Sequence, residues 1–350
     1  MRAGVKVAVV GAGVAGLCTA LFLTRRGADV ALYDVGQLTG SATWAAAGML
    51  APSYEAATDA PEHPGLFELM FAARAHWDTW WREDLKVSME RIGFSPGPSI
   101  ALCRSAGEAS LFGRLVRHGR ATRATGDELA AFGVPGESDV TAAFLLPGDG
   151  QVDNRRLVEA LSEALEARGV TVRRPAADGD GELDPADFDG DVVVDARGWR
   201  GAGAYPVKGT AVSVARAPGM PTSVVRWGEM YVVPKADRIV VGGQTFPGLS
   251  DTSVDPAMVA HLLNAAGEVL PAFRDARVIE AWSGVRPRSR DGGPILGWTC
   301  PGVYQVGGLY RDGILLGPLL GRWAAADILG EGKPPLAARF APERFRDAVA

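Results

Sequence analysis

A glycine-rich turn between a short apolar strand and a helix is the feature that most constrains the fold of this chain. Residues 6–10 (KVAVV) are typical of a buried strand, and the letters GAGVAG follow at residues 11–16. The apolar face of residues 15–26 predicts a helix that ends at Gly27, and residues 29–34 predict a second strand. Parallel strands need such a crossover, so the chain opens with a βαβ unit.

The turn carries the pattern of a dinucleotide-binding site. Gly11 permits the tight turn, Gly13 lets the backbone approach a diphosphate, and Gly16 lets the helix pack on the strand. The helix N-terminus adds N–H donors and the positive end of its dipole. Asp34 lies 18 residues after Gly16, where it can accept hydrogen bonds from a ribose. We therefore predict dinucleotide contacts from Gly11, Gly13, Val14, Ala15, Gly16 and Asp34.

The alternative is a chance glycine pattern in a chain with 45 glycines. The strand before the turn, the helix after it and the acid at the expected distance argue against chance. The turn itself does not distinguish FAD from NAD.

Length and composition limit the remaining possibilities. At 350 residues the chain is longer than one core usually supports, so two lobes are expected. A net charge of −5 argues against broad binding to nucleic acid or to an anionic membrane. No apolar run approaches the roughly 20 residues that span a bilayer, and the cysteines and histidines lack metal-ligand spacing. We expect a cytoplasmic protein with no nucleic-acid partner, membrane partner or metal site.

The order of predicted elements indicates a discontinuous first lobe with a second lobe inserted into it. Short strands dominate residues 207–243, whereas residues 170–173 and 191–195 return as strands to the first lobe. The predicted fold class is α/β, with α+β character in the second lobe: a Rossmann-type domain with an inserted, mainly antiparallel β-sheet substrate domain. The first domain is assigned residues 1–85, 145–205 and 285–350, and the substrate domain residues 86–144 and 206–284.

Two more segments suit the rest of a bound dinucleotide. Residues 41–50 (SATWAAAGML) follow the second strand, and their small side chains would let backbone and hydroxyls approach a diphosphate or a flavin ring. Residues 306–314 (VGGLYRDGI) combine exposed backbone N–H groups with a helix N-terminus that can face a developing negative charge. The alternatives are an alanine-rich helix start and a simple turn with a cap. The candidate residues here are Ser41, Thr43, Ala46, Ala47, Gly48, Met49, Gly308, Leu309, Tyr310, Arg311, Asp312, Gly313 and Ile314, to which we add Ala176, Ala196 and Gly198.

A candidate carboxylate clamp lies in residues 282–288 (WSGVRPR). Arg286 is expected at the end of a strand, fixed by the proline that follows it, and its planar guanidinium can hold a carboxylate with two hydrogen bonds. The alternative is a surface arginine that pairs with an acid.

Together these segments resemble the D-amino-acid oxidase superfamily of flavoenzymes, and within it the glycine oxidases of bacterial thiamine biosynthesis. The resemblance covers almost the whole chain. It rests on VAVVGAGVAGLCTALFL, TWAAAGMLAP, QVDNRRLVEAL, YVVP at 231–234, WSGVRPRSRDGGPILG at 282–297, GLYRDGILLGP at 308–318 and FAPERF at 340–345.

The resemblance implies a non-covalent FAD and a small amine or amino acid as substrate, with O2 as second substrate. Arg286 would pair with the substrate carboxylate, the Tyr231 hydroxyl would donate to it, and Arg311 would lie near the substrate. The α-hydrogen would leave as hydride to flavin N5, the imine would hydrolyse to an oxo acid and ammonia, and O2 would become H2O2. Family members are often homo-oligomers, although no interface signal is visible in this sequence.

Several positions depart from the family pattern and leave the substrate open. Leu309 stands where many relatives have histidine, Asp312 stands where asparagine is expected, and an acid beside Arg311 could weaken its attraction for a carboxylate. The alternatives are an oxidase or dehydrogenase of a larger D-amino acid, a secondary amine such as sarcosine, or a natural-product intermediate. An NAD-dependent dehydrogenase and a non-catalytic flavin-binding protein are the alternatives from other classes.

Overall fold

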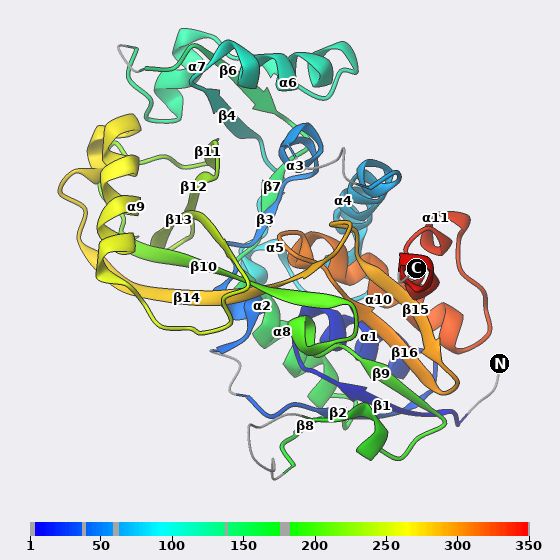
Figure 1. Ribbon diagram of the computed structural model, residues 1–350. Helices are drawn as coiled ribbons and strands as arrows, with labels where there is room; N and C mark the ends of the chain where they lie inside the picture. The colour runs from blue at the N-terminus through cyan, green and yellow to red at the C-terminus, as the bar shows by residue number, and fades with distance from the viewer. Residues whose placement is uncertain (1–3, 37–39, 59–62, 137–138, 176–182, 349–350) are drawn as a thin grey trace.

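The computed structural model describes residues 4–36, 40–58, 63–136, 139–175 and 183–348. Two β-sheets organise this part of the chain, one six-stranded and one eight-stranded, and a two-residue pairing of β3 with β7 lies between them (Figure 1). The fold class is the α/β class expected from the sequence.

The six-stranded sheet contains the opening βαβ unit. Its order is β15-β16-β9-β1-β2-β8, and the central strand β1 pairs in parallel with both β2 and β9. The strands run Lys6–Val10 (β1), Asp29–Tyr33 (β2), Val172–Arg173 (β8), Val192–Asp195 (β9), Ile295–Cys300 (β15) and Val303–Gly307 (β16). Parallel strands place their carboxyl ends at one edge of the sheet, so the residues after β1, β2 and β9 come together there.

Four helices form the main core with this sheet. They are α1 (Val14–Arg25), α4 (Leu66–Glu83), α8 (Asn154–Glu166) and α10 (Gly313–Ile328). Helix α1 contacts α8 and α10, and α10 contacts α4. Gly321 allows the close approach of α10, because a Cβ there would lie 2.8 Å from the backbone of α1. Trp77 of α4 is fully buried, and its indole N–H donates to the Leu315 carbonyl at 3.0 Å.

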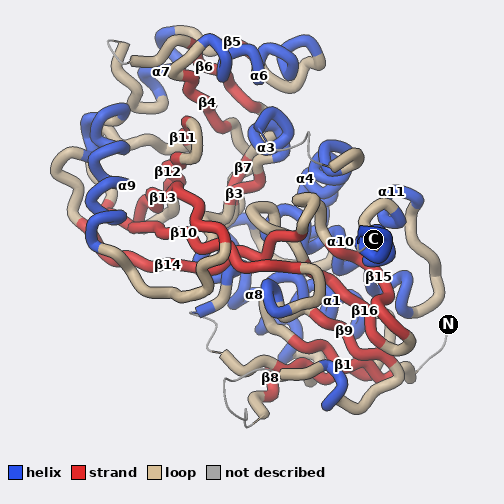
Figure 2. The backbone as a smooth tube through the Cα atoms, viewed as in Figure 1, coloured by secondary structure: helices blue, strands red, loops and turns tan. Residues whose placement is uncertain are grey.

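The eight-stranded sheet has the order β14-β10-β13-β12-β11-β4-β6-β5. Its strands run Ser99–Cys103 (β4), Thr122–Arg123 (β5), Ala142–Leu146 (β6), Ala204–Ala215 (β10), Val225–Trp227 (β11), Met230–Pro234 (β12), Arg238–Pro247 (β13) and Val278–Ser289 (β14). The described pairs are antiparallel except that of β11 with β4. The long strands β10 and β14 cross the middle of the molecule (Figure 2) and contact the 3-10 helix Gly198–Arg200 that follows β9.

The remaining elements are shorter or peripheral. They are α2 (Ala42–Ala45), β3 (Met49–Leu50), α3 (Pro52–Thr58), α5 (Met89–Ile92), α6 (Ala106–Arg117), α7 (Gly126–Ala131), β7 (Gly150–Gln151), α9 (Pro256–Val269), α11 (Pro335–Ala338) and the 3-10 helices Pro185–Asp187, Pro271–Phe273 and Pro342–Ala348. In the described ranges, no helix combines the length and the apolar character that crossing a membrane requires.

The expectation that Arg286 ends a strand is wrong. Strand β14 continues to Ser289, and its register pairs Pro287 with Pro206 of β10. An antiparallel ladder alternates between pairs that exchange N–H···O bonds and pairs that do not, so two facing prolines are compatible with a continuous strand. The expected domain boundaries at 205/206 and 284/285 fall inside β10 and β14, and the division into domains at these residues stays a prediction.

Candidate active site

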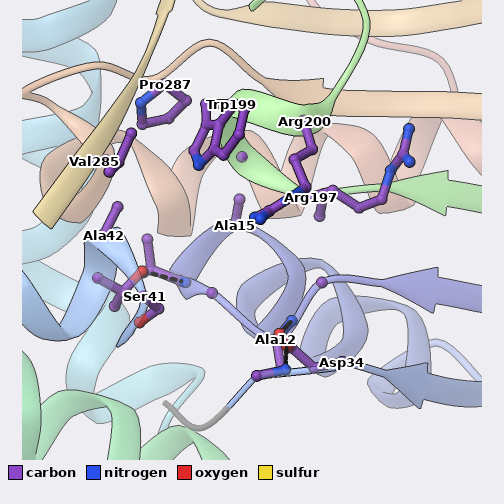
Figure 3. A pocket seen from close by; sticks show the side chains of 18 of the residues that line it. Ala12, Ala15, Asp34, Ser41, Ala42, Arg197, Trp199, Arg200, Val285 and Pro287 are labelled. Atoms are coloured by element: carbon purple, nitrogen blue, oxygen red, sulfur yellow. Dashed lines mark hydrogen bonds between the residues drawn. The ribbon is translucent and has the colours of Figure 1, made fainter. Parts of the chain in front are cut away.

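A cavity of about 860 Å³ lies at the carboxyl edge of the six-stranded sheet. Figure 3 shows Ala12 and Asp34 on one side of it, Trp199 and Arg200 facing them, and Val285 and Pro287 with Ala42 toward one end. Of the predicted cofactor residues, those that line it are Gly11, Gly13, Val14, Ala15, Asp34, Ser41, Thr43, Ala46, Ala196, Gly198, Leu309, Tyr310, Arg311, Gly313 and Ile314.

The glycine-rich turn has the geometry that its sequence predicts. Gly11 has φ +110°, and a Cβ there would overlap the Ala196 carbonyl. Gly16 does not line the cavity; a Cβ on it would overlap the Gly11 carbonyl, so it allows the turn and helix to pack. Gly13 is the N-cap of α1 and makes no side-chain cap bond, and the Thr43 hydroxyl accepts from the first helical N–H, that of Val14. The turn therefore presents backbone to the cavity.

Asp34 follows β2 directly and lines the cavity. Its carboxylate accepts hydrogen bonds from the Ala12 N–H at 2.6 Å and the Gly36 N–H at 2.8 Å. The first of these bonds ties β2 to the glycine-rich turn, as the dashed line in Figure 3 shows. Asp34 thus fixes the shape of the turn as well as offering a carboxylate to a ligand.

The two hydroxyl groups of the 41–50 segment already have partners in the protein. Ser41 caps α2 by accepting from the Trp44 N–H at 3.1 Å, and Thr43 accepts from the Val14 N–H at 2.9 Å. Sequence reasoning missed Asn154, whose amide donates to the carbonyls of Thr43 and Trp44 at 2.7 and 2.9 Å. Its position after the N-cap Asp153 gave no signal, because the contact joins residues 111 positions apart.

Three predicted cofactor residues, Ala47, Gly48 and Met49, line the neighbouring smaller cavity and not the large one. Gly48 has φ +73°, and a Cβ on it would overlap the Val152 carbonyl. Gly308 and Asp312 line neither cavity: Gly308 turns the chain with φ +66°, and Asp312 is the N-cap of α10. Ala176 lies outside the described residues.

One wall of the cavity was predicted only at Gly198. It is made by residues 197–200, directly after β9. Arg197 is held by Asp195 with N···O distances of 2.9 and 3.0 Å, and Arg200 stacks over the Trp199 ring at 4.4 Å. In Figure 3 the Arg200 side chain points toward Ala15 at the start of α1. The only signal in the sequence was the position of this segment after a buried strand.

A second cavity of about 80 Å³ adjoins the first, and the two share Ala42, Ala46, Tyr310, Arg311 and Ile314. All three predicted catalytic residues, Tyr231, Arg286 and Arg311, line it. They come from β12, β14 and the turn before α10, so the eight-stranded sheet and the helix start meet at this point.

Two glycines make room for the first two of these side chains. Tyr231 pairs in register with Gly242 of β13, and a Cβ on Gly242 would overlap the Tyr231 ring and hydroxyl. A Cβ on Gly209 of β10 would likewise overlap the Arg286 guanidinium. Arg286 donates to the Gln244 carbonyl at 3.3 Å. Both side chains therefore lie flat over a neighbouring strand.

A break in strand register brings Gln244 and Thr245 to the small cavity. The β10–β13 pairing jumps from Lys208 opposite Phe246 to Thr210 opposite Gly243, and Gln244 has φ +68°. Such a bulge bends a strand and redirects its side chains. Thr245 accepts from Arg311 at 3.3 Å.

An ion network that the sequence did not reveal completes the cavity. Arg226 is buried and donates to Glu55 at 2.5 Å, while its guanidinium lies 3.6 Å from the centre of the Tyr54 ring. Burial acts to lower the pKa of Arg226, but the neighbouring Glu55 carboxylate outweighs it and raises the pKa above its usual value. Arg311 lies 3.9 Å from Glu55 and 3.5 Å from Glu229. The guanidinium of Arg226 thus stays charged inside the protein.

The residues of the large cavity fit FAD. The volume lies toward the upper end of the roughly 300–1,000 Å³ range of ligand sites. At one end the backbone of the glycine-rich turn and the N-terminus of α1 suit a diphosphate. At the other end apolar groups of Val285, Pro287 and Tyr310 and the start of α10 can receive a flat ring. Tyr310 is fixed there by its N–H bond to the Pro287 carbonyl at 2.7 Å.

Known proteins resemble this chain over nearly its full length. The glycine oxidase of Geobacillus kaustophilus is 32% identical over 348 residues, which cover 90% of each chain. The crystal structure of that enzyme matches with a TM-score of 0.81 over 95% of this chain and 96% of the other, at 29% identity. The structure of an iminodiacetate oxidase from Chelativorans sp. BNC1 matches with a TM-score of 0.80 over 96% and 98%, at 26% identity.

The sequence profile of one family, DAO, described as FAD dependent oxidoreductase, matches residues 6–326. This range includes the glycine-rich turn, both sheets and the three side chains of the small cavity. The chain belongs to the DAO family of FAD-dependent oxidoreductases.

Proposed function

We propose that this protein is an FAD-dependent oxidase of glycine or another small amino acid or amine. The observation that carries the proposal is the pair Arg286 and Tyr231 in a cavity of about 80 Å³ that opens beside the candidate FAD cavity. A guanidinium and a phenol hydroxyl both donate hydrogen bonds, and a carboxylate accepts them. The small volume favours a substrate with few heavy atoms.

The protein's part in the reaction is to bind and orient. Arg286 neutralises the substrate carboxylate, Tyr231 donates a second hydrogen bond to it, and together they fix the direction of the Cα–H bond. At the N-terminus of α10, Gly313 lines the large cavity and Ile314 lines both cavities. The positive end of this helix dipole stabilises negative charge that develops where the two cavities meet. FAD, when bound, would supply a two-electron acceptor that O2 can reoxidise, with H2O2 as the product. The substrate loses two electrons and becomes an imine, which water converts to an oxo acid and ammonia or an amine.

Non-covalent binding of FAD is part of the proposal. Among the described residues, no cysteine or histidine lines either cavity. The cavity instead offers backbone donors, Asp34 and an apolar end, which suit a dissociable ligand. Acid precipitation should therefore release all of the yellow colour into the supernatant.

A secondary amine is the second candidate substrate. The bulge residues Gln244 and Thr245 line the small cavity together with Met49, an unbranched side chain that can adapt to an N-substituent. The resemblance to both a glycine oxidase and an iminodiacetate oxidase supports testing N-substituted glycines beside glycine.

The test is anaerobic bleaching of the flavin by a panel of amines: glycine, sarcosine, both enantiomers of alanine and proline, and a D-aromatic amino acid. We expect small carboxylated amines to bleach it and air to restore the colour with one H2O2 per turnover. Reduction of a dye without peroxide would make the protein a dehydrogenase. If no carboxylated amine bleaches the flavin, the proposed function is wrong.

A further inference from the structure

Five charged side chains line the small cavity, and the acids are unevenly shared among the arginines. Glu55 is 4% exposed and lies 2.5 Å from Arg226 and 3.9 Å from Arg311. Glu229 is 55% exposed and lies 3.5 Å from Arg311. Arg226 and Arg311 are therefore each neutralised by a carboxylate that is part of the protein.

Arg286 differs from the other two. Within the described ranges its hydrogen bond goes to a backbone carbonyl, that of Gln244, and no acidic side chain lies within ion-pair distance. Three guanidinium groups and two carboxylates leave one positive charge, and the geometry locates it on Arg286. One anionic group of a ligand would complete the balance.

Glu229 occupies the solvent side of this arrangement. It lies in the turn between β11 and β12, two residues before Tyr231, and it lines the cavity while remaining half exposed. A molecule anchored to Arg286 in about 80 Å³ has its other end in the same small space. A second carboxylate on that molecule would face Glu229 and Glu55.

We propose that the small cavity is matched to a substrate with a single carboxylate, and that Glu229 excludes amines that carry a second one. This inference rests on the proposed function and names its substrate class: monocarboxylic amines. Glu229 acts in two ways. Its charge repels a second carboxylate, and its pairing with Arg311 keeps that guanidinium from offering a second anion site.

The test compares sarcosine with iminodiacetate, two N-substituted glycines that differ by the second carboxylate. We expect the wild-type FAD-loaded enzyme to have a larger kcat/KM for sarcosine. Glu229→Gln removes the repulsion and releases Arg311, and should lower the ratio of sarcosine to iminodiacetate kcat/KM by about tenfold, the scale of one partly screened charge contact. The matched control is Glu163→Gln: Glu163 of α8 is 64% exposed, pairs with Arg91 and lines neither cavity.

A binding measurement separates this inference from the proposed function. Calorimetric titration of the FAD-loaded protein with acetate and with malonate measures the same preference without turnover. In Glu229→Gln the preference for acetate should fall about tenfold, and in Glu163→Gln it should stay within twofold of wild type. A turnover or binding ratio unchanged by Glu229→Gln overturns the inference, even if sarcosine is oxidised. A shifted binding ratio in a protein that oxidises no amine leaves the inference standing and removes the proposed function.

Discussion

The guanidinium of Arg286 occupies the space that a side chain on Gly209 would need. The two residues lie on the paired strands β14 and β10, and a Cβ on Gly209 would overlap the end of the arginine side chain. Because the side chain that carries the guanidinium is flexible, Gly209→Ala should fold, but with Arg286 displaced. We expect KM for the carboxylated substrate to rise by about tenfold or more, with kcat/KM falling in proportion.

The control for Gly209→Ala is Gly113→Ala in α6. A Cβ on Gly113 meets nothing within 4 Å, and alanine suits a helix interior. The two variants should retain FAD at the wild-type ratio of flavin to protein absorbance. Equal KM values in wild type and Gly209→Ala would show that Arg286 does not hold the carboxylate in this pose.

Removing the guanidinium itself should have a larger effect. Arg286→Ala deletes the only arginine of the small cavity that has no acidic partner among the described residues. We expect KM to rise by about 10²-fold or more while FAD stays bound, since a charge-assisted bond of roughly 1.5–3 kcal/mol is lost along with charge neutralisation. Steady-state kinetics and the flavin spectrum measure the two quantities. Loss of FAD at unchanged KM would assign Arg286 to the cofactor instead.

Tyr231→Phe isolates the hydroxyl group. The ring should stay packed over Gly242, because the substitution removes one oxygen and leaves the rest of the side chain. We expect a rise in KM of about tenfold, the value of one hydrogen bond to a charged group, and unchanged thermal stability within about 1 °C. A change in melting temperature without a change in KM would make the hydroxyl structural.

Much of the dinucleotide half could be predicted from the sequence, because its requirements are local. The turn at Gly11–Gly16 and the acid Asp34 depend on spacing along one βαβ unit, and both lie where the spacing places them. The strand Ile295–Cys300 was missed, since its apolar start is short and is followed at once by Gly297. Strand β6 (Ala142–Leu146) was not predicted either.

The charge network of the small cavity could not be predicted, because it depends on contacts between distant residues. Glu55 and Arg226 are separated by 171 positions, and Arg311 joins them from a third segment. Nothing in the neighbourhood of Glu55 in the sequence distinguishes it from a surface glutamate. The bulge at Gln244 is similar: its departure from strand geometry appears only when β13 is paired with β10.

Gly11→Ala tests the cofactor anchor. The new Cβ would overlap the Ala196 carbonyl at a backbone φ of +110°, where alanine is strained. We expect loss of FAD from the purified protein and a lower melting temperature. Gly27→Ala is the matched control, because Gly27 also has positive φ (+83°) but a Cβ there meets nothing within 4 Å. Equal FAD content in the two variants would contradict the assigned role of the turn.

Lys235 should give the protein a stability that increases with pH. Its ammonium group donates to the Val152 carbonyl at 2.7 Å and to Gln151 at 3.1 Å, and Val152 in turn donates to Gly48 beside the small cavity. Burial lowers the pKa of Lys235 from 10.5 to about 7, against the opposing effect of Asp153. Between these two values the unfolded chain binds a proton that the folded protein does not.

Raising the pH from about 7 toward 10 should therefore increase the contribution of Lys235 to the free energy of unfolding, with a slope of at most ~1.4 kcal/mol per pH unit. Below about pH 7 both states are protonated, and the cost of the buried charge is present in full. Denaturant unfolding of wild type and Lys235→Met across this range measures the difference, with the exposed Lys86→Met as control. Lys235 titrates only in the wild type. The free energy of unfolding of the wild type minus that of Lys235→Met must therefore increase with pH. A difference that is independent of pH would mean that water or Asp153 keeps the ammonium charged throughout.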